Sequence, residues 1–561
     1  MTGLPRFGEL APTEPDEALL RAAYAEVIGL VSDPGTDVAA AVSAWEAASR
    51  PARQWQSWAS LRFYQDTQDA DRKAGRQRAD RLDSLLKELD DAVLAALLGR
   101  GDQAALQAVV GPAVVARWQA DRAGFHPAIA ADLVTEQELV AEYSALMAGA
   151  KIAFGGREHT LVTIDKETLS PDRPTRHDAE RARWAWYADN RVQLDRIFDD
   201  LVRLRAGMAK TIGTPDYVSL GYLNMQRIDY DRQDVERFRA EVRSRVVPLA
   251  STLMEELRGK LDVDAVCLWD EPFTDSGGPP PLLCGMDGLG AAGLDAFDRL
   301  DPTIGAFYRQ LHEREYLDLG TRPGKAGGGF CTWFHSVRSP FVFCSGNGTS
   351  GDARTLVHEV GHAFQCWSSR EAPVSTCVFP TYESAEIHSM GLEHLAWPVL
   401  DTFFGDRADD FRRDHLVRGV RFIPYGVAVD HFQHLVYENP DASPADRHAM
   451  WQQMEATYLP WRQYGDLPHV GEGGLWQRQR HIYGRPFYYI DYTLALTCAL
   501  QLWASSLQDH PATMERYHAL CSKGGTLAFQ ELCASAGLTS PFEAGCLDDV
   551  ARRAEEWLAA H

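Results

Sequence analysis

The sequence lacks long apolar runs. Although 45% of its residues are hydrophobic, no stretch approaches the roughly 18 consecutive apolar residues that mark a membrane-spanning helix. The first ten residues, MTGLPRFGEL, also lack the basic stretch followed by an apolar one that is typical of a secretory signal peptide. We therefore expect no membrane partner and a cytoplasmic protein.

Positive charge and paired cysteines are also scarce. The chain has 56 Lys and Arg against 79 Asp and Glu, a formal net charge of −23, which disfavours nucleic acid as a partner. Its ten cysteines show no CxxC spacing, so we expect reduced thiols with packing roles, as in a cytoplasm.

The 561 residues contain no internal repeat and no extended low-complexity segment. Apolar periodicity predicts a mainly α-helical protein. We divide it into an N-terminal helical lobe over residues 1–175 and a second region over residues 176–561, which contains the candidate catalytic pattern described next. The N-terminal lobe is expected to include a short hairpin, residues 151–162, that turns at Gly155-Gly156. The predicted helices cover residues 18–31, 81–98, 177–211, 234–260, 300–317 and much of 396–460.

One stretch, TLVHEVGHAF at residues 355–364, carries the pattern H-E-x-x-H. Residues four apart share one face of a helix, so His358 and His362 can present both imidazoles to a single Zn²⁺. Glu359 lies one position round, where its carboxylate can reach a water at the metal and act as a general base. The pattern predicts a metal site that activates water.

A helix start is predicted just upstream. Residues 346–352, GNGTSGD, combine helix breakers with capping residues, and Ser350 or Asp352 is expected to cap the helix. Such a start would make residues 355–364 helical, as the metal site requires.

Catalytic zinc needs a third protein ligand while one position stays open for water. The candidates lie in TYESAEIHSMGLEH, residues 381–394, which is predicted to open a second helix. We favour Glu386. Glu383, one turn away, stays open, with a first-turn acid favoured by the helix dipole as its alternative role. Glu393 is expected either to support a metal ligand or to be an ordinary solvated or paired carboxylate.

A glycine-rich segment leads into a second predicted hairpin, with strands at residues 330–334 and 340–344. The edge of such a hairpin can bind an extended peptide through main-chain hydrogen bonds, independently of side-chain identity. Gly328 and Gly329 would let a substrate backbone approach closely, so we assign them and Phe330 to substrate binding.

Hydrolysis of an amide also needs hydrogen-bond donors at the developing oxyanion. Residues 481–492, HIYGRPFYYIDY, follow a glycine-rich approach and carry a His and several tyrosines. Tyrosine clusters usually serve packing, but hydroxyls beside an imidazole are also suitable donors. The candidates are His481, Tyr488, Tyr489 and Tyr492.

Together these segments resemble the thimet oligopeptidase and oligoendopeptidase F family of zinc metallopeptidases, and most closely its bacterial oligoendopeptidase F-like members. The H-E-x-x-H pattern is followed, 24 positions after its second His, by Glu386 in an E-x-x-S-M-x-x-E helix. The further matches are GGGFCT at 327–332, SPF at 339–341, NGTSGD at 347–352, PTYESAEIHSM at 380–390, HIY at 481–483 and PFYYIDY at 486–492. The resemblance covers about residues 327–492, with weaker similarity on both sides.

The resemblance implies a two-lobed, mainly helical zincin-type fold with a small β-sheet beside the active-site helix. It also implies a deep substrate channel that admits short peptides. It implies that His481, Tyr489 and Tyr492 bind the transition state, with Tyr488 as a competing assignment. The spacing from His481 to the tyrosines is one residue shorter than in the mammalian-type members, which leaves the order of the tyrosines open.

We therefore expect a zinc metalloendopeptidase that hydrolyses internal bonds of short oligopeptides. One Zn²⁺ would be held by His358, His362 and Glu386, and the protein would be a monomer or a small homo-oligomer. Two alternatives remain: an exopeptidase of the dipeptidyl carboxypeptidase type, and a catalytically silent peptide-binding protein.

Overall fold

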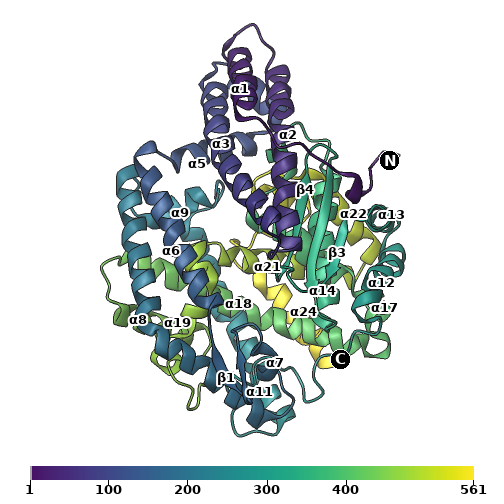
Figure 1. Cartoon of the computed structure of the whole chain (residues 1–561). Coiled ribbons are helices and arrows are strands. Elements are labelled where there is room, and N and C mark those ends of the chain that lie inside the picture. Colours follow the sequence, from purple (N-terminus) through teal and green to yellow (C-terminus); the bar gives the residue numbers. More distant parts are fainter. Residues whose placement is uncertain (1–2) are drawn as a thin grey trace. The chain divides into compact units, whose positions relative to one another are not determined.

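The computed structural model describes residues 3–561 and consists mainly of α-helices, which confirms the predicted fold class (Figure 1). The chain forms two compact units, each assembled from three segments. Unit 1 comprises Met1–Arg122, Pro280–Phe411 and Cys498–Ser540, and unit 2 comprises Ala123–Pro279, Arg412–Thr497 and Pro541–His561. The predicted division into residues 1–175 and 176–561 stays a prediction, as do the two lobes and the channel.

The principal elements of unit 1 are α1 (Glu17–Ser32), α2 (Val38–Gln65), α3 (Ala70–Gly99), α4 (Gln103–Val110), α5 (Pro112–Ala123), α12 (Gly285–Leu300), α13 (Pro302–Glu313), β3 (Leu317–Gly320), β4 (Gly329–Phe334), β5 (Ser339–Gly346), α14 (Ser350–Ser368), α15 (Ser375–Val378), α16 (Tyr382–Leu395), α17 (Asp401–Phe404), α22 (His510–Lys523) and α23 (Phe529–Ser535). Those of unit 2 are α6 (Ala130–Ala148), β1 (Ile152–Phe154), β2 (Arg157–His159), α7 (Asp165–Thr168), α8 (Arg173–Ile212), α9 (Tyr217–Asn224), α10 (Arg232–Glu241), α11 (Val247–Leu261), α18 (Ala408–Glu438), α19 (Pro444–Tyr458), α20 (Arg480–Gly484) and α24 (Cys546–Ala560). Helix α21 (Tyr489–Ser506) begins in unit 2 and ends in unit 1.

The N-terminal helices of unit 1 pack around their own core. Asp16 caps α1 by accepting a hydrogen bond from the N–H of Leu19 at 2.9 Å, and apolar residues then recur every three or four positions on the buried side. The helices predicted over residues 18–31 and 81–98 are confirmed as α1 and part of α3. The core they enclose includes Leu20, Tyr24, Val27, Val31, Val42, Trp45, Leu86, Val93 and Trp118.

Unit 2 is organised along α8, a helix of 40 residues. Asp172 caps its first turn, and Gly213 ends it in the left-handed conformation, with φ of 91°. The hairpin expected at residues 151–162 is confirmed as β1 and β2, which pair antiparallel. Gly155 and Gly156 form its turn, both with positive φ, as two-residue hairpins require.

The second sheet lies within unit 1 and has the strand order β3-β5-β4. Strands β4 and β5 pair antiparallel from Gly329 opposite Cys344 to Phe334 opposite Ser339, which confirms the predicted hairpin. Helix α14 packs against both strands, so the small sheet beside this helix is confirmed as well. The helix predicted over residues 300–317 is wrong at its end, because Leu317 pairs with Val342 in the parallel strand β3.

Helix α14 begins at Ser350, with Thr349 as its N-cap. The prediction of Ser350 or Asp352 as the cap was therefore wrong. Asp352 instead lies in the first turn, where its carboxylate accepts hydrogen bonds from the N–H groups of Asn347 (2.9 Å), Gly348 (2.6 Å) and Thr349 (3.0 Å). These bonds tie the preceding loop to the start of the helix.

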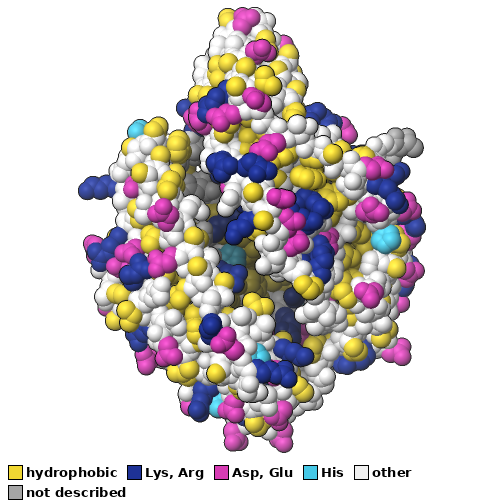
Figure 2. All heavy atoms as spheres, in the orientation of Figure 1, with side chains coloured by type: hydrophobic (Ala, Val, Ile, Leu, Met, Phe, Trp, Pro, Cys, Tyr) yellow, Lys and Arg dark blue, Asp and Glu magenta, His cyan; other side chains and the backbone are white. Residues whose placement is uncertain are grey.

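The surface is highly charged, and Figure 2 shows acidic and basic side chains interspersed on the face that it presents. Many of them pair, as Arg21 does with Glu88 at 2.9 Å. Among residues 3–561, none of the helices combines the length and the apolar character that a bilayer crossing requires.

Candidate active site

The two helices that carry the H-E-x-x-H pattern and the predicted third ligand, α14 and α16, cross at a glycine. A Cβ atom on Gly361 would lie 2.7 Å from both the carbonyl oxygen of His388 and the Cα of Ser389, closer than real Cβ contacts come. The missing side chain therefore lets the two backbones touch. This close contact brings the buried face of α16 against the histidines of α14.

The predicted metal ligands meet at this crossing. One ligand atom from each of His358, His362 and Glu386 lies within 4.8 Å of the other two. The same carboxylate oxygen, Oε2 of Glu386, is 3.4 Å from Nε2 of His358 and 3.6 Å from Nε2 of His362. Two imidazoles and one carboxylate are a donor set that suits catalytic zinc. Among the described residues, the candidate metal-binding group does not include Glu383.

Two residues of α16 hold these ligands in place. The hydroxyl of Ser389 donates a hydrogen bond to Oε2 of Glu386 at 2.9 Å. Oε1 of Glu393 lies 2.6 Å from Nδ1 of His358, which leaves Nε2 of that ring to face Glu386. Glu393 is thus paired with a predicted metal ligand, a contact that the first of its two predicted roles requires. A carboxylate behind a ligating histidine fixes the ring and raises its basicity.

The pKa values of two of these groups, His358 and Glu386, shift in the direction that their mutual contacts favour, against the effect of burial. Burial alone would lower the pKa of His358, but hydrogen bonds to Glu386 and Glu393 raise it well above its ordinary value. Burial likewise opposes the charge of Glu386, yet the two histidines hold its pKa well below the usual range. The site therefore favours a negative carboxylate beside positive charge, which a divalent cation would supply when it replaces the imidazole protons.

Glu359 lies beside this group on α14 and is 5% exposed. Burial raises the pKa of its carboxyl group, and its Oε2 atom has no hydrogen-bond partner among the residues that the structure describes. A buried carboxylate oxygen without a protein partner is costly and calls for a functional reason. A general base that takes a proton from water is such a reason.

Strand β4 lies against Glu359. A Cβ atom on Gly329 would lie 3.1 Å from Oε1 of Glu359 and 2.9 Å from Cγ2 of Thr355, so the strand approaches α14 closely because this residue is glycine. Gly328 and Gly329 are exposed, and β4 has one strand neighbour in its sheet. The ring of Phe330 stacks on Phe343 at 4.7 Å, so Phe330 offers mainly its backbone to a ligand.

The predicted oxyanion donors form a second cluster, within unit 2. The ring of His481 lies 5.7 Å from that of Tyr488, 5.1 Å from that of Tyr489 and 5.9 Å from that of Tyr492, between centroids. The tyrosines also contact one another, with Tyr488 4.9 Å and Tyr489 5.7 Å from Tyr492. The structure thus brings all four candidates together.

Two residues that the sequence did not single out orient His481. The side-chain amide of Gln479 donates to Nδ1 of His481 at 2.7 Å, and its carbonyl oxygen accepts from the hydroxyl of Tyr425 at 3.1 Å. With Nδ1 accepting, the ring carries its proton on Nε2. Burial lowers the pKa of His481 to about 4, so near neutral pH the ring is an uncharged N–H donor. No local sequence pattern could identify Tyr425, because it lies 54 positions before Gln479 in the chain.

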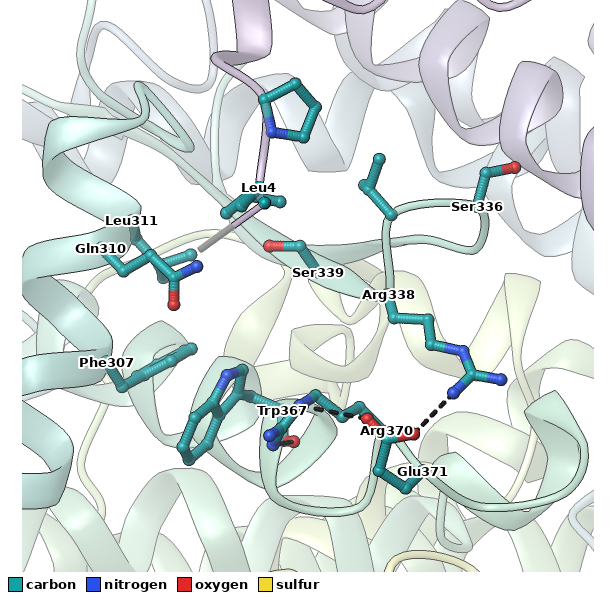
Figure 3. Close-up of a pocket in the computed structure, with 13 residues that line it drawn as sticks. Leu4, Phe307, Gln310, Leu311, Ser336, Arg338, Ser339, Trp367, Arg370 and Glu371 are labelled. Atoms are coloured by element: carbon teal, nitrogen blue, oxygen red, sulfur yellow. Dashed lines mark hydrogen bonds and ion pairs between the residues drawn. The ribbon is translucent and has the colours of Figure 1, made fainter. Parts of the chain in front are cut away.

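A further pocket in unit 1, with a volume of about 420 Å³, contains none of the predicted site residues (Figure 3). Its wall includes Leu4 of the N-terminal segment, Phe307 of α13 and Trp367 near the end of α14. At its rim Arg338 pairs with Glu371 at 2.7 Å. The pocket is therefore a surface feature separate from the site on α14.

A mainly helical fold with an H-E-x-x-H helix facing a carboxylate defines a metallopeptidase. The model of peptidase family M3 matches residues 168–276 and 303–552, and that of the peptidase M3 N-terminal domain matches residues 7–125. The chain belongs to peptidase family M3. Zinc is the metal expected of this family.

Solved structures agree with this assignment. A structure described as an oligoendopeptidase F has a TM-score of 0.93 and 38% identity over 99% of both chains. A Pz peptidase A with an inhibitor has a TM-score of 0.93 and 35% identity, again over 99% of both chains. A second structure described as an oligoendopeptidase F, from Bacillus anthracis str. Ames, has a TM-score of 0.88 and 33% identity over 99% of this chain and 98% of its own. No curated protein matches the chain.

Proposed function

We propose that this protein is a zinc-dependent endopeptidase that hydrolyses internal bonds of short oligopeptides. The observation that carries the proposal is the meeting of His358, His362 and Glu386 beside the unpartnered oxygen of Glu359. The similarity to structures described as oligoendopeptidase F supports cleavage of oligopeptides. Its cytoplasmic location and its state as a monomer or small homo-oligomer stay predictions.

The residues of the site have distinct roles in this proposal. His358, His362 and Glu386 would hold one Zn²⁺, which when bound polarises the scissile carbonyl and makes water more acidic. Glu359 takes the proton from the attacking water and then delivers it to the leaving amine. Because its pKa is raised by burial, the protonated form of Glu359 is a suitable donor for that second step.

Substrate and transition state are bound by other residues. Gly328, directly before β4, and Gly329, its first residue, present backbone to an extended peptide, together with the backbone of Phe330. We assign stabilisation of the oxyanion to Nε2–H of His481 and to hydroxyls among Tyr488, Tyr489 and Tyr492. The family resemblance supports this second assignment.

The test is cleavage of a quenched-fluorescent series of short and long peptides, with and without chelator and added Zn²⁺. Internal cuts that are lost with chelator and restored by zinc are the expected result, and they would also show the length limit. Release of dipeptides from one end alone would identify an exopeptidase. A protein that holds zinc and cuts nothing would be a silent peptide binder.

A further inference from the structure

The segment that carries the tyrosines of unit 2 is held at a residue with an unusual backbone conformation. Phe487 has φ of 66° and is fully buried. A bulky residue rarely adopts positive φ, and such strain persists only where the surroundings enforce it. Tyr488 and Tyr489 follow directly, and Tyr492 lies one turn further along α21. The backbone conformation of Phe487 therefore sets the direction of the chain that carries the three tyrosines.

Both polar backbone groups of Phe487 are anchored by buried side chains. Its N–H donates to Oε1 of Gln433 at 2.9 Å, and its carbonyl oxygen accepts from Nη2 of Arg227 at 2.5 Å. The same nitrogen of Arg227 donates to Asp491 at 2.9 Å, and both side chains of this ion pair are fully buried. Arg227 thus joins the residue before the tyrosines to a residue between Tyr489 and Tyr492.

The ring of Phe487 packs directly against the backbone of Gly221, which has no side chain to keep the ring away. A Cβ atom on Gly221 of α9 would lie 2.5 Å from Cδ2 and 2.7 Å from Cε2 of that ring. The rings of Tyr222 and Tyr437 pack around it, at 5.8 and 5.5 Å between centroids. The guanidinium of Arg227 lies 4.3 Å from the ring of Tyr222, a cation–π contact that helps to hold the charge in the core.

We propose that Gly221, Arg227 and Gln433 are positioning residues that hold Phe487 in its strained conformation and so orient Tyr488, Tyr489 and Tyr492 for the transition state. This inference rests on the proposed peptidase function. Since oxyanion donors act mainly in the transition state, a loosened clamp lowers kcat and leaves KM nearly unchanged.

A size exchange tests the proposal on the full chain. Gly221→Ala adds the Cβ that meets the ring. Phe487→Leu removes Cε2 and replaces the rigid ring by a shorter side chain that can turn away from the new Cβ, and the double variant combines the two. Gly207→Ala, in α8, is the matched control, because a Cβ there meets nothing within 4 Å. We expect Gly221→Ala to lower kcat about tenfold or more, with KM within about twofold, and the double variant to regain most of that loss.

Amide hydrogen exchange over residues 480–492 provides a readout that does not need turnover. Exchange should quicken in Gly221→Ala, return towards the wild-type rate in the double variant and stay unchanged in Gly207→Ala. A wild-type chain that cuts no peptide would overturn the proposed function, while exchange would still decide whether the clamp exists. If Gly221→Ala keeps its kcat or its exchange rates, or if the double variant restores thermal stability without kcat, the positioning role is wrong. Phe487→Leu alone should lower kcat with KM unchanged, which keeps the test open if Gly221→Ala does not fold.

Discussion

An unpartnered oxygen on a buried carboxylate costs a protein about 1–3 kcal/mol of stability. Glu359 carries such an oxygen although an apolar residue of the same size would avoid the cost. Its neighbours on α14 suggest a functional reason for this cost. The two histidines on either side of it in the sequence, His358 and His362, face Glu386 and form the predicted metal group with it. At the scale of single residues, the protein thus loses stability at the position where the proposed reaction needs a base.

Glu359→Gln is expected to retain zinc and to lose turnover. The amide keeps the volume of the carboxylate but cannot accept a proton, which removes about 10²–10⁴-fold in rate. Metal analysis and peptide cleavage measure the two properties separately. Metal loss in this variant would make Glu359 a ligand and overturn the mechanism.

The carboxylates of α16 should differ in their effect on zinc affinity. Loss of a residue that orients a ligand costs about 10–100-fold in metal affinity, so Glu393→Gln should fall in this range and Glu386→Gln should exceed it. Glu383→Gln, one turn from Glu386, is the matched control and should keep the wild-type affinity. Competition titration with a zinc-binding dye ranks the three. A larger loss for Glu383→Gln than for Glu386→Gln would assign the third ligand to Glu383.

At the scale of elements, the geometry of the predicted metal ligands depends on how closely α14 and α16 cross. Gly361→Ala would place a Cβ against the backbone of α16 at His388 and Ser389. Overpacking of this kind costs about 1–3 kcal/mol, and since Glu386 lies on the displaced helix, zinc affinity should fall together with Tm.

The control is Gly351→Ala, in the first turn of the same helix, where a Cβ would make ordinary contact with Thr349 at 3.6 Å. Calorimetry and zinc titration on both variants separate a general loss of stability from a change at the site. Full zinc affinity in a destabilised Gly361→Ala protein would contradict the role given to this crossing.

What the sequence could predict follows from the range of the interactions. The helix of His358 and His362 was predictable because its spacing is local. Glu386 was favoured as third ligand from its place in the second predicted helix, and the resemblance supported that choice. Strand β3 was not, because Leu317 is a strand residue only through pairing with Val342 in a distant segment. The contact of Gln479 with Tyr425 and the clamp on Phe487 likewise join residues far apart in the chain, and no periodicity encodes such contacts.

At the scale of the whole molecule, half-buried histidines make stability depend on pH. Burial, reinforced by Arg53 and Arg50, lowers the pKa of His335 to about 3, and burial lowers that of His431 to about 4. An unfolded chain protonates histidine near pH 6.5. Between about pH 6.5 and these lower values the unfolded state binds more protons, so the free energy of unfolding decreases as pH falls.

We expect the Tm of metal-free protein to fall between pH 7 and pH 5, and to fall less in His335→Gln. The amide removes the titrating group and retains a partner for the hydroxyl of Ser375, which lies 3.0 Å from Nδ1 of His335. His126→Gln, at an exposed position, is the control and should follow the wild type. An unchanged pH dependence in His335→Gln would show that this histidine does not contribute to the loss.

Unlike domains formed from one continuous stretch of sequence, the two units are each built from three separate segments, and this affects the order in which their parts are synthesised. Unit 1 needs residues up to Ser540, and unit 2 needs Pro541–His561 after it. Domains generally fold as units while the ribosome delivers them from the N-terminus, but here the first 122 residues emerge hundreds of residues before their last partners. The helices that carry the predicted metal ligands, α14 and α16, are therefore synthesised before residues 498–540 complete their unit, so a nascent chain already contains the predicted zinc ligands while part of the unit around them is still missing.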